Sequence, residues 1–110
     1  SGTEEHMSLS PQHKRRLRGM ILKLVYENHE AQNHRLDDVT LTGVLERLQF
    51  DVYVNAVREL LQDLGERGLL SFKQERDRTT GRISIRQVQI SPKGRDLVEN
   101  TTSDPAVEVE

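Results

Sequence analysis

The apolar residues of this 110-residue chain recur with helical spacing in three successive segments. In the first segment they lie at i, i+3, i+4, i+7 and i+8 and comprise Leu17, Met20, Ile21, Leu24 and Val25. Ser10 and Pro11 stand ahead of this stripe, and a serine that can cap, followed by a proline at the first helical position, favours the start of a helix. We therefore predict a helix from Ser10-Pro11 to about Glu30.

The same spacing predicts two further helices, a short one and then a longer one. Thr40 is positioned to cap the short helix, whose apolar stripe comprises Leu41, Val44, Leu45 and Leu48. Asp51 is positioned to cap the longer helix, whose buried face comprises Val54, Val57, Leu60, Leu61 and Leu64. Gly68 follows at the place where a left-handed residue ends a helix. A short helix, a turn at 49–51 and a longer helix are the parts of a helix-turn-helix motif.

After Gly68 the apolar period changes from helical to two, which indicates strands. The alternating apolar positions before and after a polar loop at 76–82 are Leu70, Phe72, Ile83 and Ile85. Val88 and Ile90 then fall on the opposite parity, so we expect a bulge or a bend near Arg86-Gln87. The segment from 69 to 90 is therefore predicted to be a β hairpin with an irregular second strand.

A last short helix is predicted after the hairpin. Ser91 and Pro92 repeat the serine-proline start, and Leu97 and Val98 give this helix one apolar face. The predicted fold class is thus α+β, with a three-helix core, a two-stranded antiparallel hairpin and a short C-terminal helix.

The distribution of charge changes how the ends of the chain are interpreted. The formal net charge is −2, yet five acidic residues lie near the two ends, namely Glu4, Glu5, Asp104, Glu108 and Glu110. Residues 8–100 carry 16 positive and 13 negative charges, a net of +3. We expect 1–7 to be a disordered cloning remnant, 8–100 to be one domain and 101–110 to be a disordered acidic tail.

Several classes of protein are disfavoured by what the sequence lacks. It contains no cysteine, no apolar run long enough to span a bilayer and no signal-peptide pattern, so we expect a cytoplasmic protein without membrane contact. His29, Glu30 and His34 match no strong metal-ligand spacing, and no catalytic constellation or glycine-rich phosphate loop occurs. We therefore expect no enzymatic activity, no metal and no cofactor, and the sequence indicates no small-molecule effector.

Three local sequences carry a resemblance to a known family. They are TLTGVLERL at 40–48, VRELLQDLGERGLL at 57–70 and ISPKGRDLV at 90–98. In this order they resemble the positioning helix, the end of the recognition helix and the post-wing junction of winged helix-turn-helix transcription regulators, with the junction similar to that of the bacterial multiple-antibiotic-resistance (MarR) and phenolic-acid (PadR) groups. The resemblance covers roughly residues 10–100 and implies a winged helix-turn-helix domain whose wing is the hairpin.

The resemblance implies a regulator that binds double-stranded DNA in a sequence-specific way. A recognition helix at about 52–67 is then expected in the major groove, with helix-turn-helix contacts from Thr42, Tyr53, Asn55, Arg58 and Gln62. The basic wing at 73–86 is expected on the backbone or in the minor groove, with contacts from Lys73, Arg76, Arg78, Thr79 and Arg82. A basic cluster on the first helix is expected to add phosphate contacts from Lys14, Arg15, Arg16 and Arg18.

Other interpretations of the same residues remain open. The polar side chains of the third helix and of the hairpin are also typical of ordinary solvated surfaces. The basic cluster at 14–18 opposes the helix dipole and could instead pair with the acidic tail. The fold itself also serves as a protein-protein interaction module without DNA binding. A homodimer, with its interface on the first and last helices, is left open as well.

Overall fold

The computed structural model describes residues 10–32 and 36–109. Over these residues the chain forms an α+β fold with four helices and one two-stranded antiparallel sheet. The elements, in chain order, are α2 (Pro11–Glu30), α3 (Asp38–Arg47), α4 (Val54–Glu66), β1 (Leu70–Arg76), β2 (Ile83–Ile90) and α5 (Pro92–Val98). The segment 1–7 and His34 lie outside the described residues.

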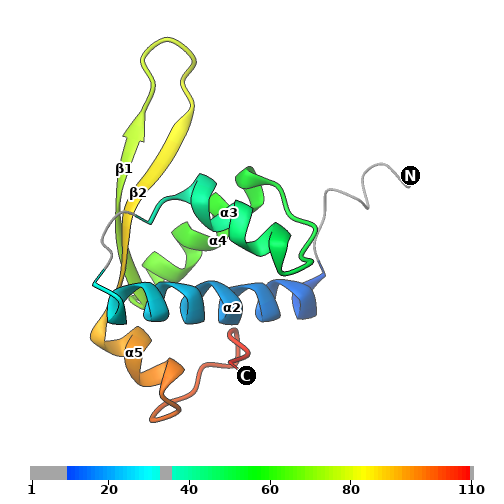
Figure 1. The fold of residues 1–110 in the computed structure, drawn as a ribbon, viewed down its shortest axis with the longest axis vertical. Helices are drawn as coiled ribbons and strands as arrows, with labels where there is room; N and C mark the ends of the chain where they lie inside the picture. The colour runs from blue at the N-terminus through cyan, green and yellow to red at the C-terminus, as the bar shows by residue number, and fades with distance from the viewer. Residues whose placement is uncertain (1–9, 33–35, 110) are drawn as a thin grey trace.

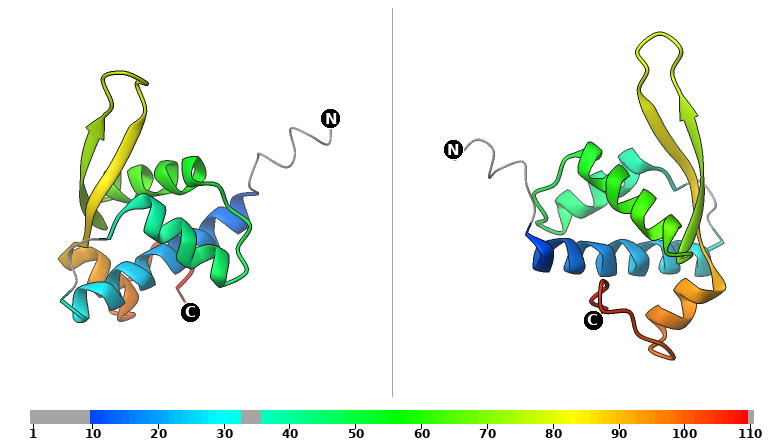
Figure 2. Two further views of the ribbon diagram at one scale, coloured as in Figure 1. Left: turned by 45° about the horizontal axis from the view of Figure 1, so that its top comes forward. Right: turned by 180° about the vertical axis from the view of Figure 1, so that it is seen from behind.

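Helix α2 is the central element of the molecule. Helices α3 and α4 pack on one side of it, while α5 and the C-terminal segment lie on the other side (Figure 1). The hairpin of β1 and β2 begins beside α2 and extends past α3 and α4, so its end stands clear of the helices in every view (Figure 2). Because α2 is covered on two sides, its buried residues extend beyond one stripe and comprise Leu17, Gly19, Ile21, Leu22 and Val25.

The serine-proline starts of α2 and α5 are confirmed. The Ser10 hydroxyl accepts a hydrogen bond from the His13 amide at 3.1 Å, and the Ser91 hydroxyl accepts one from the Gly94 amide at 3.0 Å. Each serine therefore satisfies an amide that the first turn leaves unpaired, and each proline occupies a position where no amide is needed.

The predicted caps of the two middle helices are wrong. Helix α3 begins at Asp38, and its N-cap is Asp37, whose carboxylate accepts from the Thr40 amide at 2.7 Å. Helix α4 begins at Val54 with Tyr53 as N-cap and no side-chain cap. Helix α4 thus starts beyond the residue that capping preference favours, whereas at α3 two good capping residues compete and the contacts of Asp38 favour Asp37.

The hairpin contains the irregularity that the parity change predicts. Leu70 pairs with Ile90 and Ser71 with Gln89, but the register has shifted by one residue where Lys73 pairs with Arg86. Gln87 lies in this interval with φ of +54°, in the left-handed region. The extra residue on β2 is a β-bulge, and it returns Val88 and Ile90 to the buried face.

The C-terminal segment differs from the disordered tail expected at 101–110. The side chain of Val107 joins the hydrophobic core, and the residue is only 5% exposed. The Glu108 amide donates to the Arg15 carbonyl at 3.1 Å, and Arg18 donates to the Ala106 carbonyl at 3.2 Å. Residues 104–109 therefore lie along α2, where Gly19 presents no side chain to keep them away.

Candidate functional site

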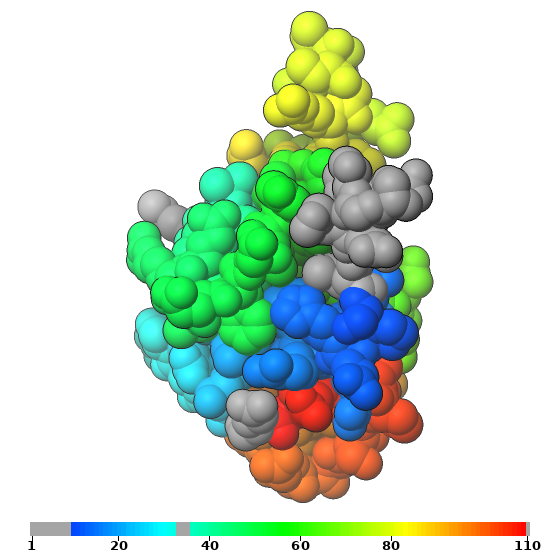
Figure 3. Space-filling view, turned by 90° about the vertical axis from the view of Figure 1, so that its right-hand side faces the viewer, coloured from blue at the N-terminus to red at the C-terminus, as the bar shows by residue number. Residues whose placement is uncertain are grey.

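A groove lies between the N-terminal half of α4 and the end of the hairpin. Its lining residues are Val54, Asn55, Arg58, Glu59 and Gln62 of α4, with Gly81, Arg82 and Ile83 of the hairpin. The predicted recognition residues Asn55, Arg58 and Gln62 are thus brought to one surface together with Arg82. A polar helix face thus lies beside a projecting hairpin, and the space-filling view shows the hairpin standing above the body of the molecule (Figure 3).

Arg58 is held by neighbouring side chains on the floor of this groove. Its Nε donates to Asp38 Oδ2 at 2.6 Å, and its Nη1 donates to Asn55 Oδ1 at 3.0 Å. The Arg58 side chain is 20% exposed and that of Asp38 only 3%. Arg58 and Asn55, both predicted to contact bases, are therefore partners of each other, and Arg58 is also the partner of a buried carboxylate.

Asp38 joins three elements through its two carboxylate oxygens. Besides Arg58 of α4, it accepts hydrogen bonds from the Ile85 amide of β2 at 3.1 Å and from the Val39 amide at 2.7 Å. Burial alone would raise the pKa of Asp38, but the hydrogen bond and charge of Arg58, with the Ile85 and Val39 amides, hold that pKa below its usual value of 3.8. The carboxylate is therefore ionised at neutral pH and fixes the angle between α4 and the hairpin.

Sequence reasoning missed Asp38, although the sequence carries a signal for it. Asp38 lies three residues before Leu41 and seven before Leu45, so it falls on the buried stripe of α3. A carboxylate on a buried stripe requires a partner, because a lone buried charge is too costly. The same principle could have indicated a buried pair with one of the arginines.

Two contacts between α4 and β1 hold the hairpin against the helix. The side-chain Nε2 of Gln62 donates to Gln74 Oε1 at 3.2 Å. Further down, Gly65 leaves room for the ring of Phe72, whose nearest atom would lie only 2.8 Å from a Cβ at that position. Gln62 is therefore engaged with the hairpin, and Gln74 is a second site residue that sequence reasoning missed.

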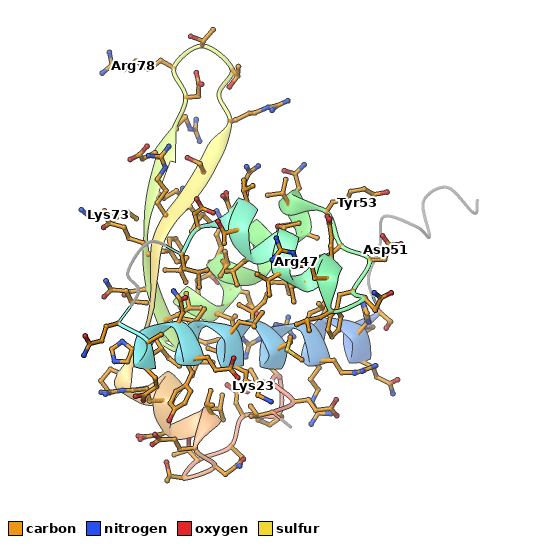
Figure 4. All side chains as sticks on the ribbon, in the orientation of Figure 1. Lys23, Arg47, Asp51, Tyr53, Lys73 and Arg78 are labelled. Carbon is orange, nitrogen blue, oxygen red and sulfur yellow. The ribbon has the colours of Figure 1, made fainter. Side chains whose placement is uncertain are left out.

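The cations of the hairpin are divided between its two faces. Side chains alternate along a strand, and residues opposite each other on paired strands share a face. Because Gln74 contacts α4, its neighbour two residues on, Arg76, lies on the face toward α4, whereas Lys73 and its partner Arg86 lie on the outer face. Arg86 also forms an exposed ion pair with Glu75 at 3.8 Å. Lys73 accordingly extends away from α3 and α4 (Figure 4).

The end of the hairpin is an ordered turn built around Asp77. Its carboxylate accepts from the amides of Thr79 at 2.7 Å and Thr80 at 3.2 Å, and these bonds, with the charge of Arg82, lower the pKa of Asp77. Within the described residues Arg78 has no carboxylate partner, and it extends from the end of the hairpin into solvent (Figure 4). Arg78, Thr79 and Arg82 are therefore presented on a defined turn.

The two remaining helix-turn-helix candidates differ in accessibility. Thr42 is buried, at 7% exposure, and its hydroxyl donates to the Asp38 carbonyl at 2.7 Å, so its side chain belongs to the interior. Tyr53 is 66% exposed and lies at the start of α4, on the opposite side of α4 from Lys73 (Figure 4). Only Tyr53 is available to a partner.

The basic cluster of α2 faces the C-terminal segment instead of the groove. Arg15 and Arg16 pair with Glu108 at 3.6 Å and 3.9 Å. Arg18 donates to Asp63 Oδ2 at 2.7 Å, and its side chain is only 16% exposed. Of the four cations in this cluster only Lys14 has no carboxylate partner among the described residues. Pairing with the acidic tail, the alternative interpretation of the cluster, is what this arrangement favours.

Comparison with protein families, with curated proteins and with solved structures finds no match to this chain. Within residues 10–32 and 36–109 no helix has the length and hydrophobicity of a transmembrane span. The same residues bring no three His, Cys, Asp or Glu side chains together as metal ligands. The groove, the hairpin and the charges around them are therefore the features of the described residues that bear on function.

Proposed function

We propose that this chain is a winged helix-turn-helix protein that binds double-stranded DNA in a sequence-specific way, as a transcription regulator does. In this proposal α3 and α4 form the helix-turn-helix, and the hairpin of β1 and β2 is the wing. The observation that carries the proposal is the groove between α4 and the hairpin, because its lining combines polar side chains on a helix with Arg82 on a projecting ribbon. A major groove about 12 Å wide accepts such a helix, while the hairpin would follow the adjacent backbone.

The contacts of each side chain suggest its role in that complex. Gln62 and Glu59 lie on the groove face of α4, where an amide can pair with adenine and a carboxylate can accept from cytosine. The hydrogen bond of Gln62 to Gln74 is solvent-exposed, so a base edge can replace it. Arg58 is held by Asp38, so we assign it to positioning α4 instead of reading bases. Arg78 and Arg82 are assigned to phosphates, since both are exposed on the end of the hairpin.

The test is binding to DNA as a function of salt. Fluorescence anisotropy of a labelled random duplex of about 20 base pairs, between about 50 and 300 mM salt, should give an affinity that falls steeply with salt concentration. The double variant Arg78→Ala, Arg82→Ala should bind about tenfold or more weakly, and the slope of log K against log salt should shrink by about 2.

A matched control removes two cations from the other side of the molecule. Lys23→Ala with Arg95→Ala changes α2 and α5, away from the groove, and should leave both the affinity and the salt slope unchanged. Absence of binding at the lowest salt would refute the proposal. Equal weakening by the two double variants would mean that net charge alone governs binding.

A protein-protein interaction module is the second candidate, and the exposed apolar side chains of the helix-turn-helix favour it. Val39 is 63% exposed and Tyr53 is 66% exposed. Large exposed apolar side chains are better suited to contact a protein partner than to contact a phosphate backbone. If the anisotropy assay shows no binding to DNA, Tyr53→Ser should weaken binding to a protein partner without lowering the melting temperature of this chain.

A further inference from the structure

Residues 104–109 bind to the surface of α2 in the way that a peptide binds to a receptor. Asp104 accepts from the Ala106 amide at 2.9 Å, and the Val107 amide donates back to the Asp104 carbonyl at 3.0 Å, so the segment forms a compact turn. This turn directs the Val107 side chain into the core and leaves the Glu108 carboxylate beside two arginines. An apolar anchor, backbone pairing and a flanking charge are the elements of peptide recognition.

The matching surface of α2 is complementary to this segment in shape and in charge. At Gly19 the backbone of Glu108 lies so close that a Cβ would collide with it. The Arg15 carbonyl accepts from the Glu108 amide, and Arg18 donates to the Ala106 carbonyl. Arg15 and Arg16 attract the Glu108 carboxylate, and Arg67 lies 3.8 Å from that of Asp104.

The contacts that retain the segment are few. Its ion pairs with Arg15 and Arg16 are long and solvent-exposed, and such pairs contribute about 0 to 1 kcal/mol each. Val107 is its one fully buried apolar side chain, since Val109 is only partly buried. Segments with so little buried apolar surface open at a lower free energy than the core does. We therefore expect the surface of α2 around Gly19 to be uncovered more often than the protein unfolds.

We propose that the face of α2 around Gly19 is a binding site for acidic peptide segments, that residues 104–109 are its internal ligand, and that an acidic segment of another protein chain binds there by displacing them. The required ligand has a valine-sized apolar residue followed directly by a carboxylate. This site is separate from the groove beside α4 and does not depend on the proposed DNA binding.

The backbone contacts favour a peptide over a phosphate backbone as the ligand. The Arg15 carbonyl accepts a hydrogen bond from outside the helix, and a peptide amide can donate it whereas a phosphodiester has no donor. Arg18 is mostly buried and is directed at a carbonyl and at Asp63, so it is not free to follow a nucleic acid. Duplex DNA is accordingly the competitor that distinguishes a peptide site from a phosphate site.

The experiment uses the full chain with its own segment disabled. Val107→Asp places a charge at the buried anchor and releases residues 104–109. A fluorescent synthetic peptide with the sequence of residues 101–110 should bind this variant, and it should bind the unmodified chain at least about tenfold more weakly, because a tethered segment competes at an effective concentration in the millimolar range. The same peptide with aspartate at the valine position should not bind.

Two glycine variants provide matched controls for the site. Added to Val107→Asp, Gly19→Ala should abolish peptide binding, whereas Gly43→Ala, where a Cβ meets nothing within 4 Å, should not change it. A duplex DNA should fail to displace the peptide. Failure of the peptide to bind a folded Val107→Asp variant, or its displacement by DNA, would overturn the proposal.

A second measurement covers the case in which Val107→Asp does not fold. In the unmodified chain, millimolar unlabelled peptide should shift the amide resonance of Gly19 and accelerate exchange of the Glu108 amide, which loses the Arg15 carbonyl as its partner. Unchanged exchange at Glu108 throughout the titration would mean that the segment is a fixed part of the fold and that the site is closed to other chains.

Discussion

Asp38 is the residue through which α3, α4 and β2 are connected, and its burial makes that connection sensitive to small changes. A buried carboxylate is stable only while its partners remain, because its charge has exchanged water for a few fixed donors. Here those donors are the Arg58 guanidinium and the amides of Ile85 and Val39. The position of the groove beside α4 therefore depends in part on this ionised side chain, together with the contacts of Gln62 and Gly65 with β1.

Replacing Asp38 with asparagine should destabilise the fold without changing its shape. The amide loses the charge that Arg58 requires and turns an N–H group toward existing donors, so we expect the free energy of unfolding to fall by about 2 kcal/mol. Urea unfolding at neutral pH measures this change. Asp37→Asn, the same substitution one residue away at an exposed N-cap, should cost less than about 0.5 kcal/mol, because asparagine caps helices nearly as well. Equal effects of the two variants would contradict the role assigned to Asp38.

Among the elements, the hairpin stores strain at one identifiable position. Gln87 adopts φ of +54°, a conformation that costs a side-chain-bearing residue roughly 1 kcal/mol. That cost is balanced by what the bulge achieves, since the shift places Val88 and Ile90 on the buried face along with Ile85. The bulge thus joins the exposed end of the hairpin to its buried base.

Glycine at position 87 should remove this strain. We expect Gln87→Gly to leave the free energy of unfolding unchanged or to raise it by up to about 1 kcal/mol, because the released strain offsets the greater entropy of the unfolded chain. Gln89→Gly, at a regular position of the same strand, should lower it by about 1 kcal/mol. Thermal unfolding of the two variants and of the unmodified chain measures these changes in stability. Comparable destabilisation of both would show that Gln87 carries no strain.

The elements also show which local signals can be predicted from sequence. Ser10 and Ser91 each precede a proline, and that combination has no competing position nearby, so both helix starts follow from local chemistry alone. At α3, Asp37 and Thr40 are both good caps, and the choice falls to Asp37 because Asp38 must reach Arg58 and Ile85. Such long-range contacts leave no trace in local capping preference.

The candidate site was only partly predictable for the same reason. Helical spacing correctly places Asn55, Arg58 and Gln62 on one surface. Helical spacing does not predict that Asp38 holds Arg58 or that Gln62 donates to Gln74, because these partners lie 20 and 12 residues away in the sequence. The position of residues 104–109 was missed because two valines in a short polar segment, Val107 and Val109, are too few to give a clear periodic signal.

For the molecule as a whole, Asp38 and Asp63 are, among the described residues, the carboxylates whose pKa is lowered by arginines of other elements. Asp38 joins α3, α4 and β2, as described above. Asp63 of α4 accepts from Arg18 of α2 at 2.7 Å and from Arg67 at 3.1 Å. Burial would raise the pKa of Asp63, but the hydrogen bonds and charges of Arg67 and Arg18 hold it below its usual value of 3.8. Both carboxylates therefore favour the folded state when they are ionised.

This arrangement predicts a specific dependence of stability on pH. A carboxyl group whose pKa is lower in the folded chain contributes stability that is fully present above its unfolded pKa, near 3.8, and that is lost as pH falls through the folded pKa. The unmodified chain should thus lose stability steeply below pH 4. The double variant Asp38→Asn, Asp63→Asn should be less stable at pH 7 but should lose less on acidification, so that the two curves converge as the pH falls.

Urea unfolding at pH 7, 4 and 3 gives these curves, and the single variants provide the internal control. Asp38 and Asp63 have no partner in common, so their separate effects at pH 7 should add to within about 0.5 kcal/mol. Each single variant should then reduce the loss of unfolding free energy between pH 7 and pH 3. The reduction should be smaller for Asp63→Asn than for Asp38→Asn, because the Asp63 side chain is 30% exposed and that of Asp38 only 3%. Parallel curves for the unmodified chain and the double variant would mean that other carboxylates govern unfolding in acid.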